Sequence, residues 1–411
     1  MNKLANKLEA SYMEQFSCTG GACEDTCCQG WKIYIDRPTY KKYKNIKDAE
    51  LGPMLDEAVK RQKKDANDNR YAYIQLDEQG FCPLLTEEKL CSLHKQLGES
   101  YLSTVCSKYP KIWNSVDGTL EVSGVVSCPE IARGVLLNPN YLEFNAGIHS
   151  FEQFNKNMIA NGINTTANHD SGNLTPLFWP LRTFAIQVLQ NRSYSINDRL
   201  IMLGMFFFEC SELVRDNRSD TIDELIANYT HVIDSGDLRE TLSEIPTVSS
   251  IQVEFLRLLT EILIQNKSAR YEQCFTEFKA GIGMDAAFDL DQITVKYESA
   301  YNDYYVPFFN EREYIYENYL VNFVFSKLFP FNEKDLYDSY LMMIIHYSLI
   351  KMNLIGMSGY HKRLDEELVI KLFQSFSRNF EHSQSSLTSL MKIVHSVGYT
   401  QMSQLMILIK N

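Results

Sequence analysis

Cysteines crowd the first third of this chain, and they constrain its fold more than any other feature. Eight of the ten cysteines lie between residues 18 and 128: Cys18, Cys23, Cys27, Cys28, Cys82, Cys91, Cys106 and Cys128. In a reducing compartment, thiols gathered in this way usually bind a metal or perform redox chemistry rather than form disulfides. We therefore predict a metal-binding or iron–sulfur domain here; a set of merely buried cysteines is the alternative.

The rest of the sequence favours such a reducing compartment. Residues 1–9 include Lys3 and Lys7 but lack the uninterrupted apolar run of a signal peptide. The most apolar later window, residues 341–357, is broken by His346, Lys351 and Asn353 and falls short of the roughly 20 apolar residues that cross a bilayer. We expect a cytoplasmic protein without membrane insertion.

Spacing narrows the kind of metal site but leaves alternatives open. The first group reads Cys-x4-Cys-x3-Cys-Cys, and Gly20, Gly21 and Gly30 permit the tight turns that let sulfurs converge. Neither the paired Cys-x2-Cys hooks of structural zinc sites nor a Cys-x3-Cys-x2-Cys triplet occurs. Four thiolates complete a zinc or an iron–sulfur site, and we favour iron–sulfur. Our hypothesis is that the first group meets Cys82, Cys91 and Cys106 in one cluster, with His94 as a donor to a sulfur rather than a ligand.

Charge is distributed unevenly along the chain. Of the net charge of −12, residues 136–411 carry −11, because residues 1–135 hold 18 Lys and Arg against 19 Asp and Glu. A nucleic-acid partner needs a basic face, so this balance argues against one. It is compatible with a basic substrate, although most acidic surplus on helical proteins is solvated surface.

Apolar spacing predicts a mainly α fold with a small, irregular α+β N-terminal domain. We place the cysteine-rich domain at residues 1–135 and a multi-helical body at 136–411, with a possible subdivision near residue 246. Strands are expected at 32–36 and 120–122. Helical periodicity covers 183–191, 196–215, 253–265, 314–328, 335–354, 365–380 and 387–395. Linkers are expected at 138–140, 161–172 and 245–247.

At this point the residues resemble a known family. The sequence is similar to the flagellin lysine N-methylase family at residues 18–35, 81–84, 91–94, 97–99, 106–110, 179–182, 189–195, 199–200, 317–322 and 329–331. The N-terminal part also resembles a broader group of zinc- or iron-chelating cysteine-rich domains. The resemblance implies transfer of methyl groups from S-adenosylmethionine to lysine ε-amino groups of flagellin by a protein with an iron–sulfur cluster; we favour 4Fe-4S, and zinc is the alternative. One departure is Lys111, where the family pattern has an arginine that can bind a planar group with two donors.

A conventional nucleotide-type cofactor turn is missing from the sequence. Rossmann-like methyltransferases bind their cofactor at a Gly-rich turn between a strand and a helix. The nearest candidate, residues 280–285 (Ala-Gly-Ile-Gly-Met-Asp), follows Phe278 and Lys279 rather than a strand, so we interpret it as a loop that ends a helix.

Candidate cofactor-binding residues come from the downstream segments of the resemblance: Arg182, Arg192, Glu317, Asn318 and Tyr319. The arginines, together with Arg199, could bind a carboxylate of the cofactor or substrate, and salt bridges between domains are the alternative. Glu317 and Asn318 are equally consistent with satisfied polar groups in a core. Aromatic residues around Tyr304, Tyr305, Tyr314, Tyr316 and Tyr319 are more typical of core packing than of a methyl-lysine cage.

Two classes of function follow. We favour a lysine methyltransferase, whose catalytic base the sequence does not identify because Tyr, Asp and Glu candidates are plentiful. The alternative is a cysteine-rich metal-binding module whose helical body binds a partner and which has no catalysis of its own. The missing Rossmann turn favours the second class, and the chain-long resemblance favours the first.

Overall fold

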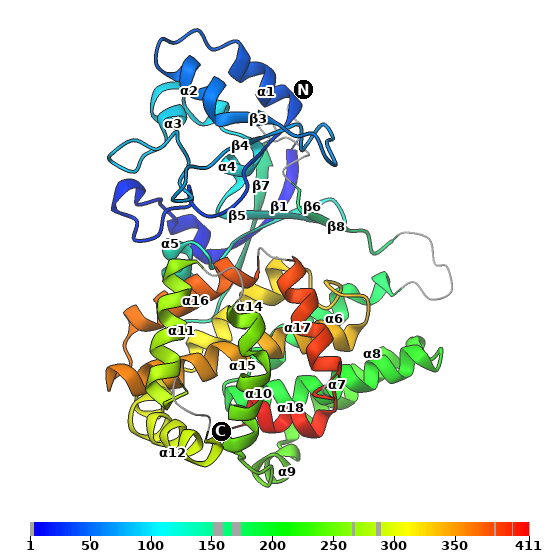
Figure 1. Ribbon diagram of the computed structural model, residues 1–411. Coiled ribbons are helices and arrows are strands. Elements are labelled where there is room, and N and C mark those ends of the chain that lie inside the picture. The colour runs from blue at the N-terminus through cyan, green and yellow to red at the C-terminus, as the bar shows by residue number, and fades with distance from the viewer. Residues whose placement is uncertain are drawn as a thin grey trace.

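The computed structural model describes residues 4–150, 159–166, 174–264, 268–284, 289–381, 384–396 and 398–410. Figure 1 shows a small cysteine-rich lobe, a five-stranded sheet and a large helical body, with the sheet between the other two. This arrangement confirms the predicted fold class, mainly α with a small N-terminal region that contains strands.

The five-stranded sheet has the order β7-β1-β6-β5-β8. Its strands are β1 (Leu4–Ala10), β5 (Lys111–Val116), β6 (Thr119–Gly124), β7 (Phe144–Ser150) and β8 (Asn161–Ile163). Strand β1 runs parallel to β6 and antiparallel to β7, while β8 runs parallel to β5. The β5–β6 hairpin turns at Asp117 and Gly118, whose positive φ angles of 50° and 80° suit a two-residue turn.

The sheet corrects the expected start of the helical part. Strands β7 and β8 both follow residue 135, so the N-terminal sheet is completed by residues that we had placed in the helical body. Apart from α5 (Pro129–Leu136), the first long helix is α6, which begins at Phe178. Periodicity missed these strands because β7 sits at the sheet edge and pairs with β1, far away in sequence.

The cysteine-rich lobe is inserted between β1 and β5. It contains a small antiparallel sheet of β2 (Tyr34–Ile35), β4 (Ala72–Ile74) and β3 (Val59–Arg61). Around it lie α1 (Arg37–Lys44), α2 (Leu51–Ala58), α3 (Ser92–Leu97) and α4 (Thr104–Lys108). Asp36 caps α1 by accepting a hydrogen bond from the Thr39 amide at 2.9 Å. The lobe has its own apolar core, which includes Cys82.

The helical body follows the predicted periodicity closely. Helices α7, α14 and α16 begin within a residue of the expected positions, and α7 matches at both ends. The body comprises α6 (Phe178–Leu189), α7 (Ile196–Arg215), α8 (Ile222–Ser235), α9 (Leu238–Ser243), α10 (Ser249–Ile264), α11 (Ala269–Ile282), α12 (Leu290–Ala300), α13 (Val306–Phe309), α14 (Tyr314–Ser326), α15 (Leu336–His361), α16 (Glu366–Phe380), α17 (Gln384–Ser396) and α18 (Met402–Ile409). One buried apolar core joins residues on both sides of position 246.

Helix α15 forms the centre of this body (Figure 1). Among the described helices it alone has the length and composition to cross a membrane, and its most apolar window is entirely buried inside the protein. It packs so tightly on α11 that a Cβ added at Gly281 would lie 1.8 Å from the Gly356 carbonyl oxygen. Glycine at this position therefore permits the close approach of the two helices.

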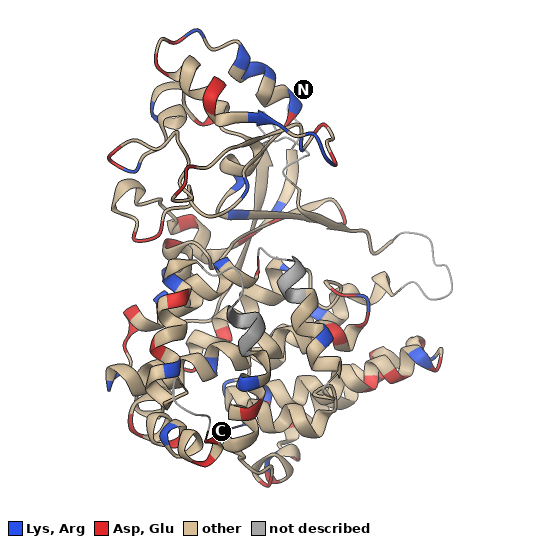
Figure 2. Cartoon of the chain, viewed as in Figure 1, with Lys and Arg blue, Asp and Glu red and all other residues tan. Residues whose placement is uncertain are grey.

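Charged residues are spread over both parts of the chain. In the view of Figure 2, lysines and arginines lie on α1 and β3 of the lobe, and acidic residues are spread over many elements of the body. The scatter agrees with solvated surface as the interpretation of the acidic surplus.

Candidate functional site

The first cysteine group lies in a loop shaped by glycines, as the sequence predicted. Gly20 and Gly30 adopt φ angles of +56° and +78°, a region that disfavours side chains. A Cβ at Gly21 would lie 2.3 Å from the carbonyl oxygen of Glu88, so this loop packs against the backbone of the second cysteine region.

Part of the first group meets the second group around the core of the lobe. Cys28, Cys91 and Cys106 pack against the apolar core that contains Cys82. The Cys82 amide donates to the Cys28 carbonyl at 2.8 Å, and Leu85 pairs with Cys91 in an antiparallel bridge. The contact between Cys28 and Cys82 brings segments separated by about 50 residues of sequence next to one another.

The acidities of these thiols show that they interact. Burial, with smaller contributions from the neighbouring Cys91 and Cys27 sulfurs, raises the pKa of Cys82 to about 11 and that of Cys106 to about 12. The Cys28 thiol donates a hydrogen bond to Cys27, which is the main reason that the pKa of Cys27 falls to about 7. Cys28 itself is correspondingly harder to deprotonate.

The thiols of Cys18, Cys23 and Cys128 also interact with one another. Burial raises the pKa of Cys128 to about 12, and the sulfurs that add to this shift are those of Cys23 and Cys18. Cys18 and Cys23 thus lie near Cys128. The hypothesis that the first group meets Cys82, Cys91 and Cys106 in one cluster stays a prediction. Cys210 and Cys274 are buried in the helical body.

The donors suit a thiophilic metal in their chemistry. All ten cysteines are free thiols. Several soft sulfurs share one apolar core and raise one another's pKa, a repulsion that a cation between them would relieve. Within the described residues, no three His, Cys, Asp or Glu side chains are grouped so that they could hold a metal ion. His94 lies exposed on α3. The metal-binding assignment of the eight cysteines stays a prediction.

Helix α16 of the body holds the first cysteine loop. The Arg378 guanidinium pairs with Asp25 at 2.5 Å and donates to the carbonyls of Thr26 and Gln29. Gln374, one turn earlier, donates to Asp25 at 2.6 Å and to the Ser127 carbonyl at 2.8 Å. The sequence showed no local signal for either residue, because their partners lie 247 or more positions away.

Arg182, a candidate for cofactor binding, instead joins the sheet to the body. Its guanidinium donates to both carboxylate oxygens of Glu121 on β6, at 2.7 and 3.1 Å, and to the Phe325 carbonyl at 3.2 Å. The Arg182 and Glu121 side chains are only 3% and 0% exposed. In this structure Arg182 therefore forms a salt bridge between domains, which was the alternative to binding a carboxylate of the cofactor or substrate.

Glu317 and two further arginines form a second network. Arg199 donates to Glu317 at 2.7 Å, and Arg192 donates to the same carboxylate at 2.8 to 3.2 Å. Asn318 faces elsewhere and donates to the Asn138 carbonyl at 2.7 Å. A role for these residues in cofactor binding stays a prediction.

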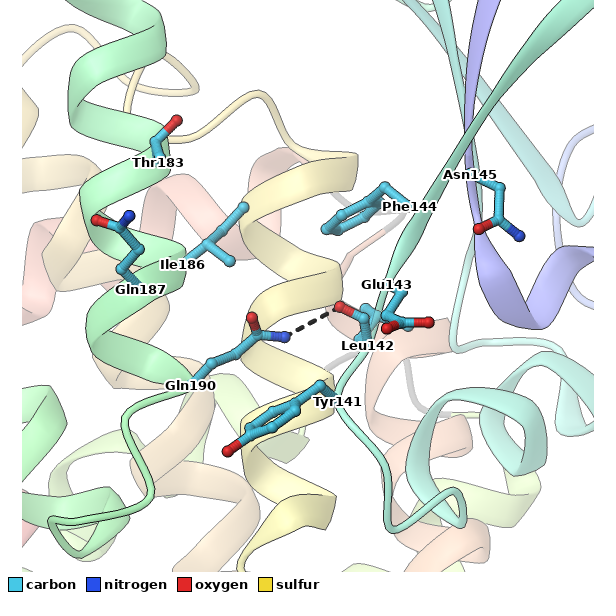
Figure 3. A pocket seen from close by; sticks show the side chains of 9 residues that line it. All are labelled: Tyr141, Leu142, Glu143, Phe144, Asn145, Thr183, Ile186, Gln187 and Gln190. Atoms are coloured by element: carbon cyan, nitrogen blue, oxygen red, sulfur yellow. Dashed lines mark hydrogen bonds between the residues drawn. The ribbon is translucent and has the colours of Figure 1, made fainter.

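One cavity borders this network. It has a volume of about 640 Å³ and lies between α6 and the segment that enters β7. The Arg192 guanidinium carbon lies 4.1 Å from the ring centroid of Tyr141, which lines the cavity. Figure 3 shows Gln190 reaching from α6 to the Leu142 carbonyl, which it contacts at 3.0 Å.

The tyrosine-rich segment divides between two environments. Tyr305 donates to Tyr316 at 3.0 Å, and both line a pocket of about 160 Å³ beside Lys351 of this chain. The Tyr319 hydroxyl oxygen instead lies 3.3 Å from His346 Nδ1 and 3.3 Å from Glu381 Oε1. All three tyrosines belong to the main core, as the core-packing interpretation predicted.

Comparison with known proteins adds a family to this geometry. Residues 182–408 match the model of the FliB lysine N-methylase C-terminal domain. The lysine-N-methylases of Salmonella choleraesuis and Salmonella typhimurium are each 22% identical over 404 residues, 95% of this chain and of theirs. The flagellar biosynthetic protein FliU of Salmonella muenchen is 36% identical over 133 residues, 32% of this chain and 78% of that protein. No solved structure matches the chain.

Proposed function

This chain belongs to the FliB lysine N-methylase family, and we propose that it transfers methyl groups from S-adenosylmethionine to lysine ε-amino groups of flagellin. The observation that carries the proposal is the extent of the similarity. Two relatives named lysine-N-methylase align with 95% of this chain, so the likeness includes both the cysteine-rich lobe and the helical body. The name of FliU, a flagellar biosynthetic protein, supports a flagellar substrate.

We further propose that the lobe binds an iron–sulfur cluster, 4Fe-4S, with zinc as the alternative. Four ligands would come from the interacting thiols of Cys27, Cys28, Cys82, Cys91 and Cys106. When bound, such a cluster supplies a one-electron redox centre and cross-links loops that otherwise have little secondary structure. Arg378 and Gln374 hold the Cys27–Cys28 segment against the body and so keep any metal in the lobe beside α16.

The place of S-adenosylmethionine is not a Rossmann-type turn at residues 280–284. That segment ends α11, where Gly283 adopts φ +76° and its amide bonds to the Ala280 carbonyl. The helix-ending interpretation made from the sequence is therefore confirmed. The candidate residue Arg192, beside the 640 Å³ cavity, is the position from which we would begin a search for the cofactor site.

Intact-mass analysis tests the proposed function. Flagellin from the same source is incubated with anaerobically purified protein, with and without S-adenosylmethionine. We expect methyl-sized mass increments that require the cofactor and that map to lysines after digestion.

Absence of increments from protein with its full metal content would contradict the proposal. It would favour the metal-binding module whose helical body binds a partner. Stoichiometric zinc without iron or visible charge-transfer absorption would overturn only the iron–sulfur assignment.

A further inference from the structure

A cavity at the junction of the sheet and the helical body is lined by ionisable groups to which the sequence assigned no function. Its volume is about 410 Å³, and its walls come from β8, from α14 and the segment after it, from α15 and from the residue that follows α16. Apolar walls include Phe323, Phe331 and Met342. The ionisable residues His346, Glu381, Lys327 and Glu333 also line it.

His346 presents an unpartnered nitrogen in this cavity wall. The side chain is 1% exposed, and its Nε2 atom has no hydrogen-bond partner. Tyr319 donates its hydroxyl hydrogen to Glu381, so the His346 Nδ1 atom, 3.3 Å from the same hydroxyl oxygen, takes the donor role. In that tautomer Nε2 carries a lone pair. Burial lowers the pKa of His346 to about 4, which keeps the ring neutral near pH 7.

Glu381 provides a buried negative charge near the His346 ring, on the other side of the shared Tyr319 hydroxyl. Its side chain is 7% exposed and lies 3.0 Å from the Lys327 ammonium. Burial opposes ionisation of Glu381, but the charge of Lys327 outweighs it together with other favourable contacts and holds the pKa at about 2. The Lys327 side chain is 26% exposed and follows α14, so solvent can receive its ammonium group.

We infer that this cavity receives the alkylammonium side chain of the target lysine, with Glu381 as its counter-ion in place of Lys327 and His346 Nε2 as acceptor of one N–H. The inference rests on the proposed function, since it identifies where the substrate of that reaction binds. Lys327 shows that the carboxylate accepts a lysine ammonium at hydrogen-bonding distance. A neutral imidazole acceptor and a carboxylate together match the donor-only chemistry of an ammonium group.

Helix α16 connects this cavity to the cysteine-rich lobe. Arg378 contacts the first cysteine loop, and Glu381 follows it by three residues, about 4.5 Å along a helix axis and on the same face. An amine bound at Glu381 would therefore lie at the side of the body that faces the proposed metal site.

The first test measures binding of n-butylammonium, a lysine side-chain analogue, to the full-length protein by ligand-observed NMR. Glu381→Gln should weaken binding of n-butylammonium about 10- to 100-fold, because the substitution removes the negative charge of a hydrogen-bond partner while keeping its size. Lys327→Met should tighten binding, because it removes the competing ammonium. A general loss of folding cannot produce that gain.

A matched control comes from a similar trio elsewhere in the body. Glu277 lies 2.9 Å from Lys371 and 3.1 Å from His361, outside the junction cavity. When Glu277→Gln is added to Lys327→Met, the tightened binding of n-butylammonium should stay unchanged. Unchanged binding in both Glu381→Gln and Lys327→Met would overturn the inference.

Methylation kinetics separate this inference from the proposed function. We expect Glu381→Gln to raise the KM for flagellin while the dissociation constant of S-adenosylmethionine stays the same. If the wild-type protein methylates flagellin and Glu381→Gln has the same KM for flagellin, the lysine site is refuted and the proposed function still holds. Butylammonium binding that depends on Glu381, in a protein that methylates nothing, would support the amine site and refute the proposed function.

Discussion

Replacing Arg182 by methionine should destabilise the protein strongly, because it leaves the Glu121 carboxylate buried without its counter-ion. Glu121 lies on β6 with no side-chain exposure, and both of its oxygens accept hydrogen bonds from Arg182. Removal of one partner of a buried ion pair costs about 3–5 kcal/mol. We expect a loss of that size in the free energy of unfolding at pH 7.

Equilibrium unfolding in urea, followed by far-UV circular dichroism, measures this loss. A matched control is Arg215→Met, which removes an exposed i,i+3 pair with Glu212 and should change stability by less than about 0.5 kcal/mol. The double variant Arg182→Met/Glu121→Leu should recover most of the stability, since it leaves no unpaired charge at this site.

The stability loss of Arg182→Met should also depend on pH, in a direction that is specific to this mechanism. Burial already raises the pKa of Glu121 while Arg182 opposes the shift, so loss of Arg182 raises it further. The folded variant then binds a proton more tightly than the unfolded chain, and its deficit should shrink as the pH falls from 7 toward 5. A single variant that loses less than about 1 kcal/mol, or a double variant no better than the single one, would refute the reasoning.

Three further outcomes are expected. Cys82→Ser should lower the metal content measured by elemental analysis, whereas Cys210→Ser, in the helical body, should not; equal metal content in both would remove Cys82 from the proposed ligands. The pKa of His346 is about 4 in the folded protein against 6.5 as its ordinary value, so its contribution to stability is complete above pH 6.5 and is lost as the pH falls toward 4. His346→Phe should flatten that part of the urea-midpoint profile, and an unchanged profile would show that other groups cause it. Arg378→Met should speed limited proteolysis within residues 18–30, because it removes the contacts to Asp25, Thr26 and Gln29; cleavage at the wild-type rate would count against its role in holding this loop.

Local pattern was a good guide wherever structure depends on neighbours in sequence. Apolar spacing located α7 at both ends, and glycine positions indicated the turns at Gly20 and Gly30. The same reasoning missed β1 and β7, because an edge pairing between distant segments leaves no periodic signal in either one. It also interpreted His346 only as an interruption of an apolar window, since that position has no chemistry until Tyr319 and Glu381 lie beside it.

The sequence by itself determined the class of the protein: the density of thiols, the helical body and the family resemblance that the comparisons confirmed. Those properties depend on residue type and on spacing within a few turns. Only the tertiary structure decided that Arg182 neutralises Glu121, which thiols share a core, and that Glu381 meets Lys327 at a cavity. Charge pairing and burial depend on distances through space, and packing of remote segments sets those distances.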